Sequence, residues 1–533
     1  MTEPVARSVV VPNRYRDSVA LMRIAASVTG IDGLVRASVL MATEANLADA
    51  GEKGFAVDPG TFGKVPTAND VFVGLIGTEA ACEEALSSVE GQLRSGSPTG
   101  NGGGSSTGGA VELPRSLQAA ARGAANDGDP AGAEHGSATS IAMVSVPGAF
   151  AASEARKALQ LGMHVMLFSD NVALDDEAEL KRTAGERGLL LMGPDCGTAM
   201  IDGVPLGFVN AVRRGPIAVI GASGTGMQEV MARVHQLGSG ISQAIGCGGR
   251  DLREAINAAT MCQALRMVDH GGTEVVVLIS KPPHPSVLKT VVAATRSLVD
   301  RGTPVILAFT GLDPAAVAGS GLIVAPSLAD AARLAVENVR GNSDGGPAGP
   351  HPPSDGPDRP DRPDPLHRLP KDFPKERTAI VGAFVGGTLC TEFRFLLERV
   401  PPGLTVKCVD FGDDDYTRGR PHPMIDPELR DADVLKALHD PTVALVHFDV
   451  VLGFGASGDP IGPLLSGLAE FQREARTGPV LSAHVLGTDL DSQGRPGIVE
   501  RLRAVGVHVS DTNAEAAVLA NSVADQLVVR GAA

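Results

Sequence analysis

Short apolar runs, separated by amphipathic segments, constrain the possible folds of this chain more than any other feature. The first three are IAMVSV (141–146), HVMLFS (164–169) and LLLM (189–192), with helical patterns at 150–161 and 175–187 between them. Strands that lack polar alternation are buried on both faces, which indicates parallel sheets covered by helices on both sides. We therefore predict a multi-domain α/β fold. The pattern continues at PIAVIG (216–221), ISQAIG (241–246), EVVVLIS (274–280), TPVILAF (303–309), TAIVGA (378–383), TVKCVDF (405–411), TVALVHF (442–448) and GPVLSA (478–483).

Two segments of low complexity divide this pattern. Residues 96–138 are rich in Gly, Ser and Ala around a short helical patch, and residues 341–376 are rich in Pro, Asp and Gly. Such compositions bury too little apolar surface to offset the backbone entropy of folding, so both segments are predicted to be linkers. A chain of 533 residues is long enough for about three or four domains. The predicted regions are an N-terminal segment with three strands and two helices (1–95), and α/β domains at 139–215, 216–340 and 377–530.

The composition argues against several classes of partner. Only 46 basic residues oppose 62 acidic ones, the net charge is −16, and aromatic residues make up 3% of the chain. The chain therefore lacks the basic face and stacking rings of nucleic-acid binders, and the basic surface that recruits proteins to anionic membranes. Its N-terminus is too polar for a signal peptide, and no apolar run approaches the ~20 residues of a membrane helix. The six cysteines form no C-x-x-C pair, so we predict no metal site, no disulfide framework and a cytoplasmic location.

The glycine-rich turn in AVIGASGTGMQEVMARVHQLG (218–238) is the clearest candidate for a ligand site. A strand ends there and a helix begins near Thr225, so free backbone N–H groups and the helix dipole favour an anion. Met227 and Gln228 replace the Lys-Ser/Thr pair of a Walker A loop. A tight β–α turn that merely needs glycine is an equally good interpretation. The predicted phosphate-binding residues are Gly221, Ser223, Gly224, Thr225 and Gly226.

A second strand–turn–helix of the same kind occurs in AIVGAFVGGTLCTEF (379–393). Gly386 and Gly387 precede Thr388, which opens the helix, so these three residues are also predicted to bind phosphate. The two turns either face one shared anion or are simply turns. Asp449 follows a further strand and precedes a glycine-rich loop, and a flexible loop is an equally good interpretation there.

Charged residues follow other strands, where ligands bind in open parallel sheets. Lys281 in LISKPPHP is placed to contact a phosphate or carboxylate, with a solvated lysine as the alternative. Arg418, Arg420 and His422 lie in DFGDDDYTRGRPHPMIDP (410–427), where the arginines suit a carboxylate or phosphate. The aspartates 413–415 suit either magnesium or solvent. Cys196 follows a strand beside Asp195, but a packed thiol is several times as common as a nucleophile without a visible base.

At these residues the chain resembles the FdrA family, relatives of the succinyl-CoA synthetase alpha subunit. The resemblance implies a Rossmann-like CoA-binding domain at 139–215, followed by two flavodoxin-like domains of the synthetase type at 216–340 and 377–530. The segments that carry it, in chain order, are FSDNVALDDE, GPDCGTAMIDG, GASGTGMQE, GCGGRDL, SKPP, GRPHPMIDP and DVVLGFGASGDP. The positions that correspond to CoA-contacting loops are Ser145, Pro147, Asn171, Pro194, Asp195 and Cys196. No cofactor follows from the residues alone; CoA is the one that the resemblance implies.

The chain departs from the synthetases where they carry a phosphorylated histidine. Residues 310–321 read TGLDPAAVAGSG, without histidine, and Lys281 lies near the position of their supporting glutamate. No ATP-grasp domain is evident either. The resemblance therefore implies a phosphate-binding subunit that works with companion subunits, as in assemblies of the oxamate carbamoyltransferase type.

Three functions follow as hypotheses. The first is carbamoyl transfer from carbamoyl phosphate, with Lys281, Arg418, Arg420 and His422 orienting the co-substrate and acting in catalysis. The second is an ADP-forming acid–CoA ligase subunit that receives its phosphohistidine from elsewhere. The third is a non-catalytic scaffold that binds CoA or a nucleotide.

Overall fold

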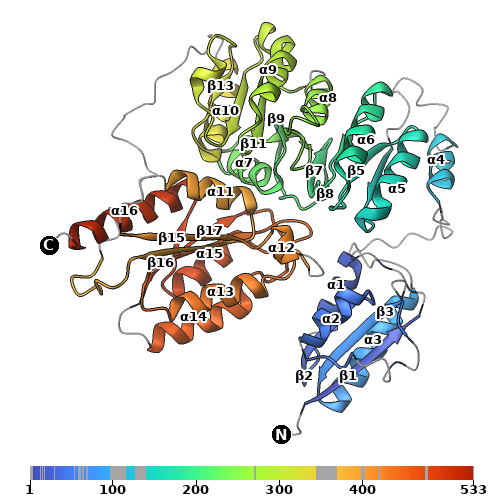
Figure 1. Ribbon diagram of the computed structural model, residues 1–533, viewed down its shortest axis with the longest axis vertical. Helices are drawn as coiled ribbons and strands as arrows, with labels where there is room; N and C mark the ends of the chain where they lie inside the picture. The colour runs from blue at the N-terminus through green and yellow to red at the C-terminus, as the bar shows by residue number, and fades with distance from the viewer. Residues whose placement is uncertain are drawn as a thin grey trace. The chain divides into compact units, whose positions relative to one another are not determined.

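The computed structural model consists of two units, residues Met1–Leu113 with Asp414–Pro421, and Pro114–Asp413 with His422–Ala533 (Figure 1). The predicted linkers lie outside the described residues, except for 116–126, 341–343 and 369–376. The residues that the structure describes are 4–12, 14, 16, 18–28, 30–52, 54–57, 62, 65–67, 70–95, 116–126, 140–268, 272–343, 369–397, 403–417, 421–474 and 478–531.

The first unit contains a three-stranded antiparallel sheet in the order β1-β3-β2. In β3, Val71, Val73 and Leu75 pack in one core and Phe72 packs in another, because alternate side chains of a strand point to opposite faces. The predicted three strands are confirmed, but the described residues form three helices in this segment rather than two. The elements are β1 (Val5–Val11), α1 (Ser18–Val28), β2 (Leu34–Met41), α2 (Glu44–Glu52), β3 (Val71–Gly77), α3 (Glu79–Ser95) and α12 (Asp414–Thr417).

The second unit begins with α4 (Leu117–Asn126), which lies in the helical patch of the first predicted linker. A small parallel sheet follows, in the order β4-β5-β6. All three strands were predicted from their apolar runs, and the two helices between them also form as predicted. These elements are β4 (Ile141–Val144), α5 (Gly148–Gln160), β5 (His164–Leu167), α6 (Leu174–Glu186) and β6 (Leu191–Met192).

A seven-stranded sheet has the order β13-β12-β11-β9-β10-β7-β8, and its strands from β9 to β13 are parallel. The hairpin β7–β8 pairs antiparallel with β10, although its residues belong to the segment 139–215 that we treated as a separate domain. The elements are β7 (Thr198–Ile201), β8 (Val204–Gly207), β9 (Arg214–Gly221), α7 (Gly224–Gln236), β10 (Ile241–Gly246), α8 (Ala259–Val268), β11 (Val275–Ser280), α9 (Pro285–Asp300), β12 (Val305–Phe309), the 3-10 helix Pro314–Val317, β13 (Ile323–Val324) and α10 (Leu328–Ser343).

A five-stranded parallel sheet completes this unit, in the order β15-β14-β16-β17-β18. The prediction of parallel sheets flanked by helices is confirmed here as well. The elements are β14 (Ala379–Phe384), α11 (Gly387–Leu396), β15 (Thr405–Asp410), α13 (Glu428–Leu438), β16 (Val443–Val451), α14 (Gly462–Glu474), β17 (Val480–Leu486), α15 (Arg495–Ala504), β18 (His508–Ser510) and α16 (Asn513–Gly531).

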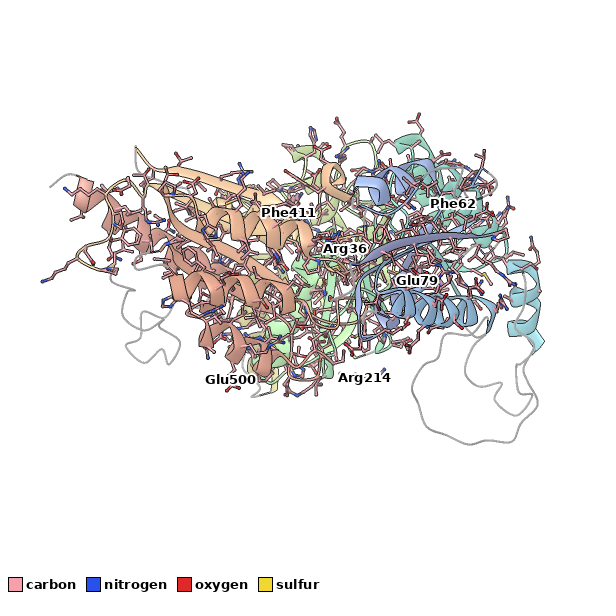
Figure 2. All side chains as sticks on the ribbon, turned by 90° about the horizontal axis from the view of Figure 1, so that it is seen from below. Arg36, Phe62, Glu79, Arg214, Phe411 and Glu500 are labelled. Atoms are coloured by element: carbon pink, nitrogen blue, oxygen red, sulfur yellow. The ribbon has the colours of Figure 1, made fainter. Side chains whose placement is uncertain are left out.

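One apolar core joins the two larger sheets. It includes Met231 of α7, Ala332 of α10, Leu389 of α11 and Ala520 of α16, so these four helices pack against one another. At the ends of the sheets the side chains differ in exposure: Phe411, after β15, is buried, whereas Arg214 at the start of β9 is exposed (Figure 2). Within the described part of the chain, every helix is too short or too polar to cross a membrane.

Candidate functional site

The first predicted phosphate site is the start of α7. Ser223 caps this helix: its hydroxyl accepts a hydrogen bond from the Gly226 N–H at 3.0 Å. Met227, Val230 and Val234 are buried, so the apolar face anchors the helix as the sequence predicts. Gly224 is exposed, and Ser223 and Thr225 are half-buried. Because a helix leaves its first N–H groups without partners inside the helix, this end is open to an anion.

The second predicted site, the start of α11, has a different cap. Gly386 occupies the cap position and offers no side chain. Instead, the carboxylate of Asp449, from β16, accepts hydrogen bonds from the N–H groups of Val385 (2.7 Å) and Gly386 (2.9 Å). Asp449 is fully buried, and burial raises its pKa while these two hydrogen bonds lower it. A buried carboxylate therefore holds the turn that the sequence predicts to bind phosphate.

The two helix starts meet. The hydroxyls of Ser223 and Thr388 lie 2.5 Å apart, and a Cβ atom at Gly386 would lie 3.1 Å from Cβ of Thr225. We call residues 223–226 and 386–388 the paired helix starts. The structure thus brings together two turns that are more than 150 residues apart in the sequence.

Asp410 lies beside the paired helix starts, at the end of β15. Its Oδ1 accepts a hydrogen bond from the Gly412 N–H at 2.9 Å, and a Cβ atom at Gly387 would overlap its Oδ2. Burial raises the pKa of Asp410 to about 6, against the lowering effects of the Gly412 N–H and of Lys281. Lys281 is exposed and close enough to Asp410 to lower this pKa.

His422 lies on the other side of Gly412, where a Cβ atom would be 3.0 Å from its Nε2. The Nδ1 atom accepts a hydrogen bond from the Met424 N–H at 3.2 Å, which assigns the proton of the neutral ring to Nε2. Burial lowers the pKa of His422 to about 4, so the ring is neutral at physiological pH. Its ring centroid lies 5.8 Å from that of Phe208, and the two ring planes are tilted by 35°.

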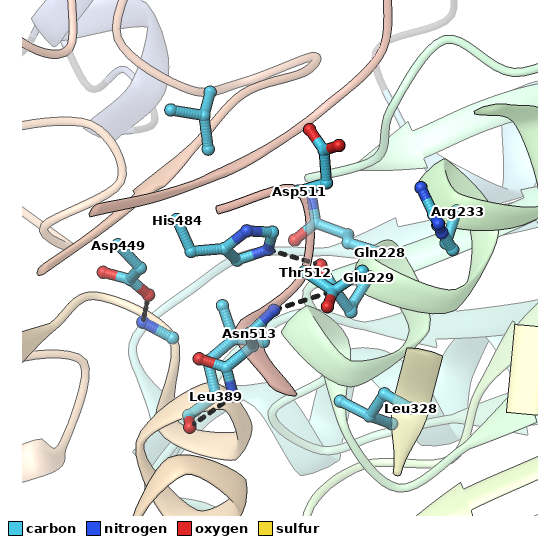
Figure 3. A network of polar contacts seen from close by, with 12 residues as sticks. Gln228, Glu229, Arg233, Leu328, Leu389, Asp449, His484, Asp511, Thr512 and Asn513 are labelled. Carbon is cyan, nitrogen blue, oxygen red and sulfur yellow. Dashed lines mark hydrogen bonds and ion pairs between the residues drawn. The ribbon is translucent and has the colours of Figure 1, made fainter. Parts of the chain in front are cut away.

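A buried polar network links α7, α11 and α16 (Figure 3). Glu229 of α7 accepts a hydrogen bond from the Asn513 N–H at 3.4 Å, and its carboxylate lies 2.7 Å from Nε2 of His484. The Asn513 amide donates to the Leu389 carbonyl (3.0 Å) and to Glu392 of α11 (2.7 Å). Because Asn513 is the first residue of α16, one residue connects both helices to a third. Burial would lower the pKa of His484, but the Glu229 carboxylate raises it.

The loops in which the resemblance predicts CoA contacts gather around Ser169. The Val146 N–H donates to the Ser169 hydroxyl, and the Asp195 N–H donates to its carbonyl, both at 3.0 Å. Ser145 and Pro147 are exposed, and Pro147 caps α5 without a side-chain hydrogen bond. Gly148, the first residue of α5, packs closely against the backbone carbonyls of Asp170 and Asn171.

The other predicted CoA residues differ in their accessibility. Asp195 and Asn171 are exposed, and both have positive φ angles, 55° and 53°. Pro194 is buried. Cys196 is buried too, and burial raises the pKa of its thiol to about 12, so the packed thiol is the interpretation that the structure favours.

Two predicted catalytic residues, Arg418 and Arg420, lie outside the described residues. Sequence reasoning missed Asp410, Glu229, Glu392 and Asn513. A signal existed for the two glutamates, because both helices begin with the pattern G-T-x-x-x-E, in GTGMQE (224–229) and GTLCTE (387–392). Asp410 and Asn513 have no comparable local signal.

Two family models match the chain. Residues 383–523 match the CoA-ligase family, and residues 2–108 match "AllF, heavy metal-associated domain". The first match indicates an enzyme of the acid–thiol ligase type. The second is not accompanied by metal ligands: residues 2–108 contain one cysteine, Cys82, and no histidine, and Cys82 is buried in α3. The described residues contain no group of three His, Cys, Asp or Glu side chains that could hold a metal ion. A heavy-metal site therefore does not fit this domain.

The chain is similar to three proteins of different kinds. It is 27% identical over 144 residues to the alpha subunit 2 of an ADP-forming succinate–CoA ligase of Archaeoglobus fulgidus, covering 26% of this chain and 49% of that subunit. A solved structure, ATP citrate lyase from Methanothrix soehngenii in complex with citrate and coenzyme A, shares 16% identity with a TM-score of 0.34, covering 44% of this chain and 42% of that one. The uncharacterized protein YahF of Escherichia coli (strain K12) is 36% identical over 543 residues, covering 96% of this chain and 97% of YahF. The chain, a multi-domain α/β protein with a domain of the CoA-ligase type, therefore belongs to the family of YahF.

Proposed function

We propose that this chain is the phosphate-binding subunit of a carbamoyltransferase-type assembly, and that it positions carbamoyl phosphate for attack by an amide or ureide nitrogen. The observation that carries the proposal is the meeting of the paired helix starts, with the Ser223 and Thr388 hydroxyls 2.5 Å apart. The start of α7, with the hydroxyl of Thr225, supplies donors suited to the phosphate of an acyl phosphate, and the contact with α11 holds this start in place.

The proposed residues have separate roles, which follow from their charges. The start of α7, with Ser223 and Thr225, binds the phosphate because its cap is a neutral hydroxyl. Lys281 is an exposed cation close to Asp410 and balances the phosphate charge. The Nε2–H of His422 donates to the carbonyl oxygen as negative charge develops there during attack. Arg418 and Arg420 remain predicted ligands for a carboxylate of the acceptor.

This function, of the FdrA kind, needs no phosphohistidine. Residues 310–321 contain no histidine, and the neutral His422 has an imidazole nitrogen already engaged with Met424. Carbamoyl phosphate is itself an activated acyl donor, so positioning and charge stabilisation suffice for transfer. The companion subunits would supply the rest of the active site.

An acid–CoA ligase subunit is the second candidate. It is favoured by the CoA-ligase match over 383–523 and by the loops gathered around Ser169, where α5 begins without a side-chain cap. Such a ligase would form an acid-labile phosphoenzyme on incubation with ATP, and a carbamoyltransferase would not. A third candidate, a scaffold that binds CoA or a nucleotide, would bind its ligand without turnover.

The proposal is tested by co-expressing the chain with the products of neighbouring genes and measuring phosphate release from carbamoyl phosphate with candidate amides and ureides. In the Thr225→Val variant we expect the affinity for carbamoyl phosphate to fall about tenfold, because one hydrogen bond to a charged group is lost. Thr290→Val is the matched control, since Thr290 on α9 bonds only to Asn257 in the described residues. Unchanged affinity in Thr225→Val would overturn the assignment of this site.

A further inference from the structure

We propose that Asp410 is the catalytic base of this site and accepts the proton of the attacking nitrogen. The inference rests on the proposed carbamoyl transfer and goes beyond it, because it assigns the proton to a residue that the sequence did not single out. Asp410 ends β15, directly opposite Phe384 at the end of β14, so it lies at the carboxyl edge of the sheet beside the start of α11.

One of the two carboxylate oxygens of Asp410 is available to accept a proton. Oδ1 is held by the Gly412 N–H at 2.9 Å, which fixes the orientation of the carboxylate. Oδ2 points at the backbone of Gly387, the first residue of α11, so that any side chain at Gly387 would collide with it. Among the described residues no hydrogen-bond donor is paired with Oδ2. Asp410 is half-buried, so solvent and a substrate can reach it.

The other titratable groups around the paired helix starts are not available for this task. Asp449 is fully buried, and its two oxygens accept the Val385 and Gly386 N–H groups. Glu229 and Glu392 are buried. Glu229 contacts His484, and Glu392 accepts a hydrogen bond from the Asn513 amide. Asp413 is exposed to solvent.

His422 has the opposite role. Its Nδ1 accepts the Met424 N–H, so Nε2 carries a proton and is a donor. A Cβ atom at Gly412 would lie 3.0 Å from this Nε2 and 3.2 Å from Oδ1 of Asp410, so the ring and the carboxylate lie close together around Gly412. The site therefore offers a donor on His422 and an acceptor on Asp410, the two kinds of group that an oxyanion and a proton transfer need.

Burial and the neighbouring charges bring the pKa of Asp410 close to the pH at which an enzyme works. Burial, Asp449 and Asp413 raise its pKa, whereas the Gly412 N–H and Lys281 lower it, with a result of about 6. At pH 7 to 8 the group is mostly a carboxylate, and it is a stronger base than an ordinary exposed aspartate. A base whose pKa lies near the operating pH is the effective kind.

The step balances without an oxidant or a further reactant. The acceptor nitrogen attacks the carbamoyl carbon, a C–N bond forms, and the C–O bond to phosphate breaks. Phosphate leaves with that electron pair at the start of α7. The proton of the nitrogen passes to Oδ2 of Asp410 and is later released to solvent.

The test uses the full chain with its companion subunits and the Asp410→Asn variant, which keeps the acceptor for the Gly412 N–H. We expect kcat to fall about 10²- to 10⁴-fold, the range of general base catalysis, while KM for carbamoyl phosphate changes less than threefold. The wild-type kcat should decline at acidic pH with an apparent pKa of about 6, and the residual activity of Asp410→Asn should lack this decline. Asp410→Glu should recover part of the activity, and Asp300→Asn, which changes an exposed aspartate at the end of α9, should retain it.

The outcomes separate the two proposals. If the wild-type assembly releases no phosphate with any acceptor, the carbamoyltransferase proposal is wrong and this inference falls with it. If the wild type is active and Asp410→Asn keeps more than a third of its kcat, or keeps the acidic decline, only the inference is overturned.

Discussion

The starts of α7 and α11 share a sequence pattern but differ in charge. Both begin with G-T-x-x-x-E, and both follow the end of a buried parallel strand. At α7 a neutral hydroxyl, from Ser223, caps the helix. At α11 the Asp449 carboxylate caps the preceding turn, and Asp410 lies against Gly387. The positive end of α7 therefore remains available to an anion, whereas that of α11 already faces two carboxylates.

This difference shows that a glycine-rich turn does not by itself define a phosphate site. The N–H groups of such a turn are donors that a neighbouring strand can satisfy, and here β16 supplies the residue that does so. We infer that the two helices have different roles: α7 binds the phosphate, and α11 orients a base. Four substitutions would break or sharpen this contrast.

The largest effect is expected from Asp449→Ala, which removes the carboxylate at the start of α11. Two buried N–H groups, of Val385 and Gly386, would lose their acceptor, so the free energy of unfolding should fall by about 4 kcal/mol. Chemical denaturation measures this loss. Asp459→Ala is the control: its ion pair with Arg501 is exposed, and its removal should cost less than about 1 kcal/mol. Equal effects of the two would mean that Asp449 does not hold the turn.

Glu392 and Glu229 occupy equivalent positions in the two helices but should respond differently to pH. Burial raises the pKa of Glu392 to about 7, so the folded state binds a proton more tightly than the unfolded state does. The stabilisation that protonated Glu392 gives the folded state is therefore fully present at pH values below the ordinary pKa of a glutamate. It is lost as the pH rises from there toward 7. Glu392→Gln should remove this loss, which amounts to at most about 3 kcal/mol. Unfolding free energies at pH 5 and pH 8 measure it.

Glu229→Gln is the matched comparison, because the Glu229 carboxylate lies against the imidazole of His484 as well as the Asn513 N–H, whereas Glu392 has no such ring partner among the described residues. Glu229→Gln should destabilise the protein at both pH 5 and pH 8, because a neutral amide is a weaker partner for the buried imidazole of His484 than a carboxylate is. If Glu392→Gln leaves the difference between pH 5 and pH 8 unchanged, Glu392 does not titrate in this range.

The smallest effect is expected from Ser223→Ala. It removes the cap of α7 and the contact with Thr388, and caps of this kind contribute about 1 kcal/mol. The start of α11 has glycine at the equivalent position and tolerates it because Asp449 replaces the cap. A thermal unfolding measurement checks the loss, with Ser239→Ala as a control, because Ser239 contributes to the C-terminal end of α7 through its backbone N–H, which the substitution keeps. A loss above about 3 kcal/mol would show that the hydroxyl contact, rather than the cap, dominates.

The sequence predicts the parts of the fold that depend on local patterns. Apolar runs indicate the parallel strands, and glycines followed by Thr225 and Thr388 mark both helix starts. It does not reveal that these starts meet, because the contact depends on how two sheets pack through one core. The sequence does not predict the roles of Asp410 and Asn513 for the same reason, because each role depends on a neighbour that is distant in the sequence.

The hairpin β7–β8 bears on how the protein can be divided. Its pairing with β10 means that a fragment starting at residue 216 would expose a strand edge that is covered in the whole protein. Uncovered edges recruit strands from other molecules, so such a fragment should aggregate. A fragment that starts before Thr198 keeps the edge covered, and expression trials should begin there.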